Sequence, residues 1–124
     1  MAITLPEITI EGNPRGTSET AADWWCDGFM LGWNNPQAAK EPPAPGPPLN
    51  DECLNSYYQG IDAGRNARRG VEDKFVDYDG PAIDVDPGGE FYEEAERKWR
   101  EAWQEFLRHE DPHSEQEPPE IVFE

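Results

Sequence analysis

The residues most suggestive of catalytic chemistry lie near the C-terminus, where His109, Glu110 and His113 follow the order H-E-x-x-H. In zinc peptidases this motif needs one continuous helix, because two imidazoles four residues apart ligate the metal while the glutamate acts as general base. Here Pro112 interrupts it. Proline removes a backbone N–H and clashes with the preceding turn, so the helix is expected to end before His113. The chain also has no third histidine. We therefore predict no zinc site, and no other metal or cofactor.

Other catalytic signatures are also missing from the sequence. It contains no glycine-rich phosphate loop, no G-x-S-x-G nucleophile elbow and no cysteine and histidine spaced as a catalytic pair. Glycoside hydrolysis needs only two carboxylates, but among 27 acidic residues any one pair carries no information. We therefore expect that the chain is not an enzyme.

Acidic residues dominate the composition, with 27 Asp and Glu against 10 Lys and Arg, for a net charge of -17. Residues 1–70 carry nine acids and five bases, whereas residues 71–124 carry eighteen acids and five bases. Such a field repels nucleic acids and anionic membranes, and it accelerates encounter with basic proteins or cations. Solubility is the competing explanation of the acidity. We expect no direct binding of nucleic acid and favour a basic protein partner.

The sequence also bears on location and on the cysteines. No hydrophobic run approaches the ~20 residues that span a bilayer, and the N-terminus lacks the basic and apolar regions of a signal peptide. We therefore expect a cytoplasmic protein that does not bind membranes. Two cysteines, Cys26 and Cys53, are too few for a disulfide scaffold and fall within apolar helical patterns, which favours buried free thiols over the alternative of one disulfide bridge.

The elements that position these residues follow from hydrophobic periodicity and from capping and breaking residues. The α+β class is expected, in one domain over residues 1–124, with short strands near both termini. Helices are predicted over about 18–34, 50–69 and 90–109, and Gly70 is expected to close the second of them. Residues 36–48 hold six prolines and form a stiff linker, and residues 110–124 form an acidic tail whose order the sequence leaves open.

The first two predicted helices share a repeat with an offset of 32 residues. Gly28 matches Gly60, Gly32 matches Gly64, and an aromatic residue precedes the first glycine of each pair by three positions. This spacing places the aromatic and both glycines on one helical face. Because a glycine inside a helix costs ~1 kcal/mol relative to alanine, we predict that the two faces form a closely packed helix pair. The competing interpretation is a groove floor that accepts a partner's backbone.

Residues 24–66 therefore combine an aromatic-x-x-Gly helix, a proline break and a second aromatic-x-x-Gly helix. This arrangement resembles ribosome modulation factor. Members of that family are small basic proteins that sit on ribosomal RNA, so the resemblance implies a helix pair and a ribosomal site. The charge of this chain is opposite to that of the family, and we carry no functional residue over from it.

Residues 74–86 alternate apolar and acidic residues on both sides of Asp79, which predicts a small acidic β-hairpin. One face would carry Asp77, Asp79, Asp84 and Asp86. Like charges at this separation destabilise a hairpin, so the pattern needs an explanation. Two interpretations are favoured: a solvated edge that opposes aggregation, and a face for a basic partner. A calcium site is the third, and it is disfavoured because the spacing fails the EF-hand pattern.

These observations favour a small acidic inhibitor that binds and blocks a basic protein, such as an immunity protein for a nuclease toxin or a nucleic-acid mimic. The carboxylates would meet Arg and Lys of the partner, and a tryptophan off the glycine face would anchor the contact. The alternative is a structural or adaptor subunit of a larger assembly. The sequence does not indicate an oligomeric state. The predicted binding residues are Asp77, Asp79, Asp84, Asp86, Glu90, Glu93, Glu94 and Trp24.

Overall fold

Three helices and two short strands make up the structure, a computed structural model that describes residues 5–10, 21–37, 51–77, 86, 88–110 and 120–123. In chain order they are β1 (Ile8–Ile10), α1 (Ala21–Asn34), α2 (Asp51–Lys74), α3 (Glu90–Glu110) and β2 (Ile121–Phe123). The α+β class, the three helices and the short terminal strands are confirmed. Most of the proline-rich linker and of the acidic tail lies outside the described residues.

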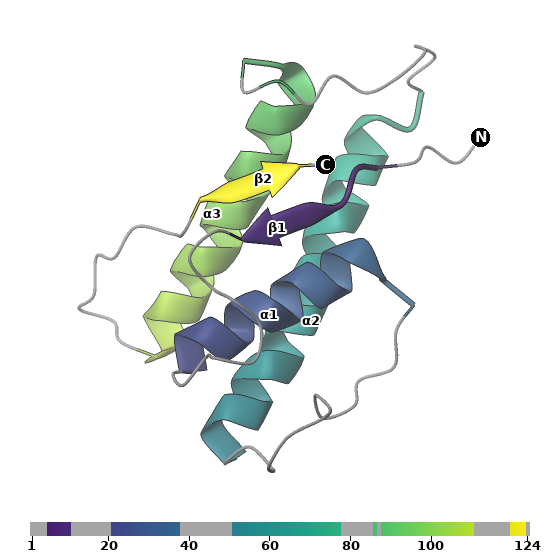
Figure 1. The fold of residues 1–124 in the computed structure, drawn as a ribbon. Coiled ribbons are helices and arrows are strands. Elements are labelled where there is room, and N and C mark those ends of the chain that lie inside the picture. Colours follow the sequence, from purple (N-terminus) through teal and green to yellow (C-terminus); the bar gives the residue numbers. More distant parts are fainter. Residues whose placement is uncertain are drawn as a thin grey trace.

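The elements form two layers (Figure 1). Helices α2 and α3 run antiparallel and form one layer. Helix α1 and the two strands form the second layer, which packs against one side of that helix pair. Aromatic residues fill the space between the layers. The Trp25 ring lies 5.0 Å from Phe106 and 5.5 Å from Trp99, and Phe29 meets Trp99 edge-on at 4.8 Å. Few but large side chains thus supply the core of a chain whose apolar content is only 35%.

Helices α1 and α2 are in direct backbone contact through their glycines. A Cβ at Gly28 would overlap the carbonyl oxygen of Tyr57, and a Cβ at Gly60 would overlap that of Trp25. Gly32 and Gly64 repeat this reciprocal contact one turn further along. Each glycine Cα therefore faces a carbonyl oxygen of the other helix, an arrangement that only a residue without a side chain permits. The close packing predicted for the repeat is what the structure shows, and the groove-floor interpretation is wrong because the two faces cover each other.

Helix α2 is longer than predicted. We expected it to end near Arg69, with Gly70 as the closing residue, but it continues through Gly70 to Lys74 and spans 24 residues. Val71 is fully buried and Phe75 is 8% exposed, so the extra turn carries core side chains. Their burial outweighs the ~1 kcal/mol that glycine costs inside a helix.

The two strands pair antiparallel, with Ile8 opposite Phe123 and Ile10 opposite Ile121. The other edge of β1 is covered by α1: the Asn34 side chain accepts a hydrogen bond from the Ile8 N–H at 2.8 Å and donates one to the Ile8 carbonyl at 2.9 Å. The Trp33 indole N–H donates to the Pro6 carbonyl at 3.0 Å. Side chains of α1 thus satisfy the backbone groups that an edge strand leaves open.

The first strand of the predicted acidic hairpin does not form where the structure describes it. Lys74 is the last residue of α2, residues 75–77 form a turn, and Val76 is 58% exposed rather than facing a core. Residues 78–85, with Asp79 and Asp84, lie outside the described residues. The helix prevails over the strand pattern because Phe75 and Val71 reach the core at helical spacing.

Candidate protein-binding surfaces

The carboxylates predicted to bind a partner fall mainly at one end of the molecule, where α2 ends and α3 begins. These two helix ends are held together, since the Phe75 and Phe91 rings lie 5.9 Å apart. Exposed acids surround the junction. We call this surface the acidic end; it comprises Asp73, Asp77, Asp86, Glu90 and Glu93. Asp73 was not among the residues that the sequence singled out, because the helix end was placed before it.

Glu94, which the sequence assigned to the binding face, is only 8% exposed. Its carboxylate accepts a hydrogen bond from the Arg97 guanidinium at 2.6 Å and lies 3.9 Å from Nζ of Lys74. It thereby links the end of α2 to the first turns of α3. Glu94 therefore serves the junction, where it pairs with one base of each helix.

Trp24, the predicted anchor, is half-buried on α1. Its ring meets Tyr57 of α2 edge-on, with 5.9 Å between centroids. Asp79 and Asp84 lie outside the described residues, so the structure brings together only part of the predicted set.

The histidine motif contributes a surface pair. His109 Nε2 lies 3.2 Å from a carboxylate oxygen of Glu105 at an exposed site, and α3 ends at Glu110, before His113 as expected. His113 itself is outside the described residues. Among the residues that the structure does describe, no three His, Cys, Asp or Glu side chains gather as metal ligands would.

A groove between α2 and α3 was not apparent from the sequence. It encloses about 510 Å³, and residues of both helices line it. The small side chains of Ala63, Ala67 and Ala102 leave the space open, while Trp25 of α1 and Phe106 form its floor. The rim is polar. It comprises Gln59, Asp62 and Asn66 on α2 and Lys98, Glu101, Glu105 and His109 on α3.

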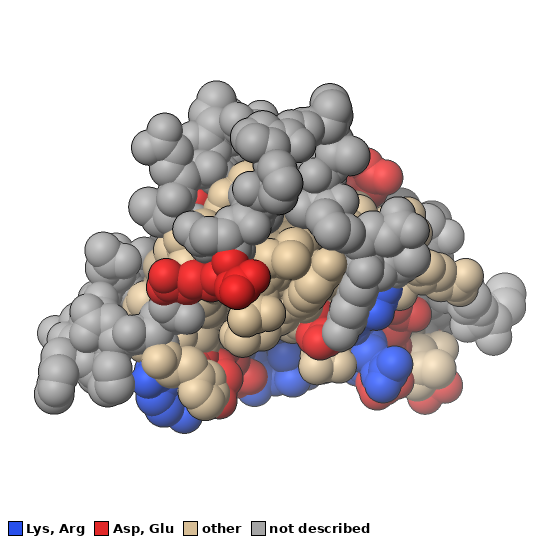
Figure 2. Space-filling view, turned by 90° about the horizontal axis from the view of Figure 1, so that it is seen from below, with Lys and Arg blue, Asp and Glu red and all other residues tan. Residues whose placement is uncertain are grey.

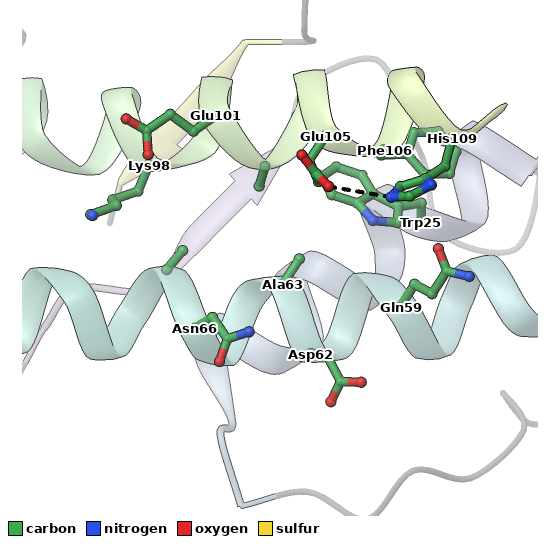
Figure 3. Close-up of a pocket in the computed structure, with 12 residues that line it drawn as sticks. Trp25, Gln59, Asp62, Ala63, Asn66, Lys98, Glu101, Glu105, Phe106 and His109 are labelled. Atoms are coloured by element: carbon green, nitrogen blue, oxygen red, sulfur yellow. Dashed lines mark hydrogen bonds and ion pairs between the residues drawn. The ribbon is translucent and has the colours of Figure 1, made fainter. Parts of the chain in front are cut away.

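The close-up in Figure 3 shows how this groove is arranged. Glu105 and His109 of α3 lie across from Gln59 and Ala63 of α2, and the Trp25 ring lies between the helices behind them. No periodic pattern in the sequence predicts such a groove, because the groove depends on the distance between α2 and α3 in the folded chain. The only sequence signal was the alanines at helical spacing on α2 and α3.

The basic residues are unevenly placed. Every Lys and Arg that the structure describes lies on α2 or α3. In Figure 2 basic and acidic side chains alternate along one edge of the molecule. Much of this alternation is local pairing at exposed sites, with Arg100 2.7 Å from Glu96 and Arg108 3.0 Å from Glu105. Pairs of this kind contribute well under ~1 kcal/mol each, so these acids remain open to another basic partner.

Both cysteines are buried free thiols, as the sequence predicts. Burial raises the pKa of the Cys26 thiol far above its ordinary range, and the nearby carboxylates of Asp23 and Asp27 raise it further. A thiol that stays protonated is a poor nucleophile and a poor metal ligand.

No protein-family model, curated protein sequence or solved structure matches this chain. Within the described ranges, no helix is both long enough and apolar enough to cross a membrane.

Proposed function

We propose that this protein binds a basic protein through the acidic end and thereby blocks it, in the manner of an immunity protein for a nuclease toxin or of a nucleic-acid mimic. One observation carries the proposal. Two helices converge with their carboxylates exposed, while two bases of these helices, Lys74 and Arg97, pair with the buried Glu94.

Helix electrostatics alone do not account for this arrangement. Glu90 and Glu93 lie in the first turn of α3, where negative charge is favourable next to the helix dipole. Asp73 lies at the opposite pole, in the last turn of α2, where negative charge is unfavourable. Asp77 follows the C-terminus of α2, so the dipole of that helix does not stabilise it either. Carboxylates that gather at this end although the dipole of α2 disfavours them there support a role in recognition.

The acidic end is expected to act mainly on the rate at which the partner associates. A concentrated negative surface steers a basic protein towards it and raises the association rate ~10-fold or more at low salt, an effect screened beyond ~8 Å at physiological ionic strength. Arg and Lys of the partner, which would otherwise bind phosphates, would then pair with these carboxylates.

The test begins with affinity capture from the source cells, using the full chain as bait. A single basic toxin or nucleic-acid enzyme supports the proposal, whereas a multisubunit machine favours an adaptor role. The association rate with the captured protein is then measured across a salt series for wild type and for Asp73→Lys/Asp77→Lys. Lysine suits both sites, since one is a helix C-terminus and the other an exposed turn.

The matched control is Glu7→Lys/Glu120→Lys, because both residues are exposed, lie beside the terminal strands and change the net charge equally. We expect slower association and a flatter salt dependence for the first variant and a small effect for the control. Equal effects would mean that overall charge, and not the acidic end, determines the encounter.

A further inference from the structure

The groove between α2 and α3 has an apolar floor, a polar rim and a definite closed end. A Cβ at Gly70 would lie 2.9 Å from Cε of Lys98, so the lysine side chain crosses from α3 onto α2 at that point. It closes the groove towards the acidic end. The other end of the groove lies between Gln59 of α2 and His109 of α3 (Figure 3).

The groove exists because α1 separates its two walls. Trp25 is 2% exposed and its ring packs on Phe106, which holds α3 away from α2 at this level. Alanines at positions 63, 67 and 102 do not fill the space that results. The hollow is thus fixed by buried aromatic packing and needs no rearrangement to accept an apolar side chain.

We propose that this groove accepts a basic amphipathic helical segment of the partner, which inserts an apolar side chain between the alanines and pairs its Arg or Lys with the acidic rim. The proposal rests on the proposed function and adds a second contact to it. Charge complementarity identifies the occupant: the rim carries three carboxylates, from Asp62, Glu101 and Glu105, against one lysine, Lys98.

The rim carboxylates can change partners at little cost. Glu105 pairs with Arg108 and His109, and Glu101 lies 3.6 Å from Arg97, but all of these side chains are more than half exposed. Exposed pairs within one helix contribute little to stability, because water screens both charges. An incoming arginine over an apolar floor forms a less hydrated and stronger pair.

The spacing also favours a helix. Glu101 and Glu105 are one turn apart on α3, and Ala63 and Ala67 are one turn apart on α2, so contacts recur at helical intervals along both walls. A segment with an apolar residue flanked by bases three or four positions away matches that repeat. A volume of about 510 Å³ accommodates a few side chains, not a whole domain.

The probe is a capped amphipathic peptide of Leu, Ala, Arg and Lys, about 15 residues long so that it forms a helix. It is titrated into the full-length, isotope-labelled protein, and amide chemical shifts are followed by NMR. We expect perturbations confined to residues 59–67 and 98–109. A peptide of the same pattern with Glu in place of Arg and Lys should cause none. Shifts confined to the acidic end, or no shifts up to about 1 mM peptide, would overturn the proposal.

Two variants of the groove and one control variant sharpen the test. Asp62→Asn/Glu105→Gln removes two rim charges and should weaken binding about tenfold, whereas Glu7→Gln/Glu96→Gln makes the same change in net charge elsewhere and should weaken it less than about threefold. Ala63→Leu fills the groove with a good helix former and should abolish binding without lowering the melting temperature. Equal weakening by both charge pairs, or undiminished binding to the filled groove, would show that the peptide does not use the groove.

The two proposals fail separately. If the captured partner depends on the acidic end while the basic peptide leaves the groove unshifted, the proposed function stands and the groove proposal is wrong. If the peptide binds in the groove but capture yields no basic protein, the groove proposal stands and the proposed function is wrong.

Discussion

Replacing Gly28 by alanine tests whether backbone contact between α1 and α2 holds the fold together. The added Cβ would overlap the Tyr57 carbonyl oxygen and lie 2.9 Å from the Ile61 nitrogen. Both are backbone atoms inside a helix, so rotating a side chain cannot relieve the overlap. The two helices must separate by roughly 1 Å, and a gap of that size forfeits a quarter to a half of the dispersion energy of the atoms that lose contact.

The magnitude follows from two opposing terms. Alanine gains ~1 kcal/mol over glycine as a helix former. Overpacking a close contact costs ~1 to 3 kcal/mol or more, and here the displaced helix also carries the buried Phe29 and Trp33. With the overpacking cost at the upper end of that range, we expect the free energy of unfolding to fall by about 2 kcal/mol, a sizeable part of the roughly 5 to 15 kcal/mol typical of a whole domain.

Gly70→Ala is the internal control. Its Cβ meets only the end of the Lys98 side chain, which can move, so the helix-forming gain of ~1 kcal/mol should dominate and the variant should equal or exceed wild type in stability. Urea unfolding followed by circular dichroism gives both values on one scale. If Gly28→Ala proves as harmless as Gly70→Ala, the helices are not in the contact described and the reasoning fails.

Other predictions test further contacts. Asn34→Ala should lower the free energy of unfolding by about 1 to 3 kcal/mol, because it leaves the β1 backbone unsatisfied, whereas Asn35→Ala at the exposed neighbouring site should have little effect in the same urea assay. The Cys26 thiol should resist alkylation in the folded protein even at pH 9, because burial raises its pKa, and it should react at once in urea; rapid alkylation of the native protein would contradict its burial. Glu94→Ala should lower Tm by about 3 °C more than Glu93→Ala, since both changes remove a charge near the start of α3 but only Glu94 is buried and bridges to α2; equal shifts in a thermal scan would show that the junction does not depend on it.

The sequence predicted the helices well where local periodicity and tertiary burial agree. Helix α3 was predicted nearly to the residue, because its apolar positions recur at one spacing from Phe91 to Phe106 and acids begin it. The glycine repeat predicted the α1–α2 contact because four glycines inside helices are too costly without one. Where the two signals conflict, the prediction failed: Gly70 and the alternating residues after it indicated a helix end and a strand, yet Val71 and Phe75 continue the helix into the core.

By itself the sequence determined where the three helices lie, though not where α2 ends, together with the glycine contact and the excess of negative charge, since each depends on residues close together in the chain or on composition. Only the tertiary structure decided how distant residues combine. It paired the two terminal strands and buried Glu94 among bases of both helices. It also opened a groove above Trp25 by setting the separation of α2 and α3. These features depend on the sum of many weak contacts across the core, and no local pattern encodes that sum.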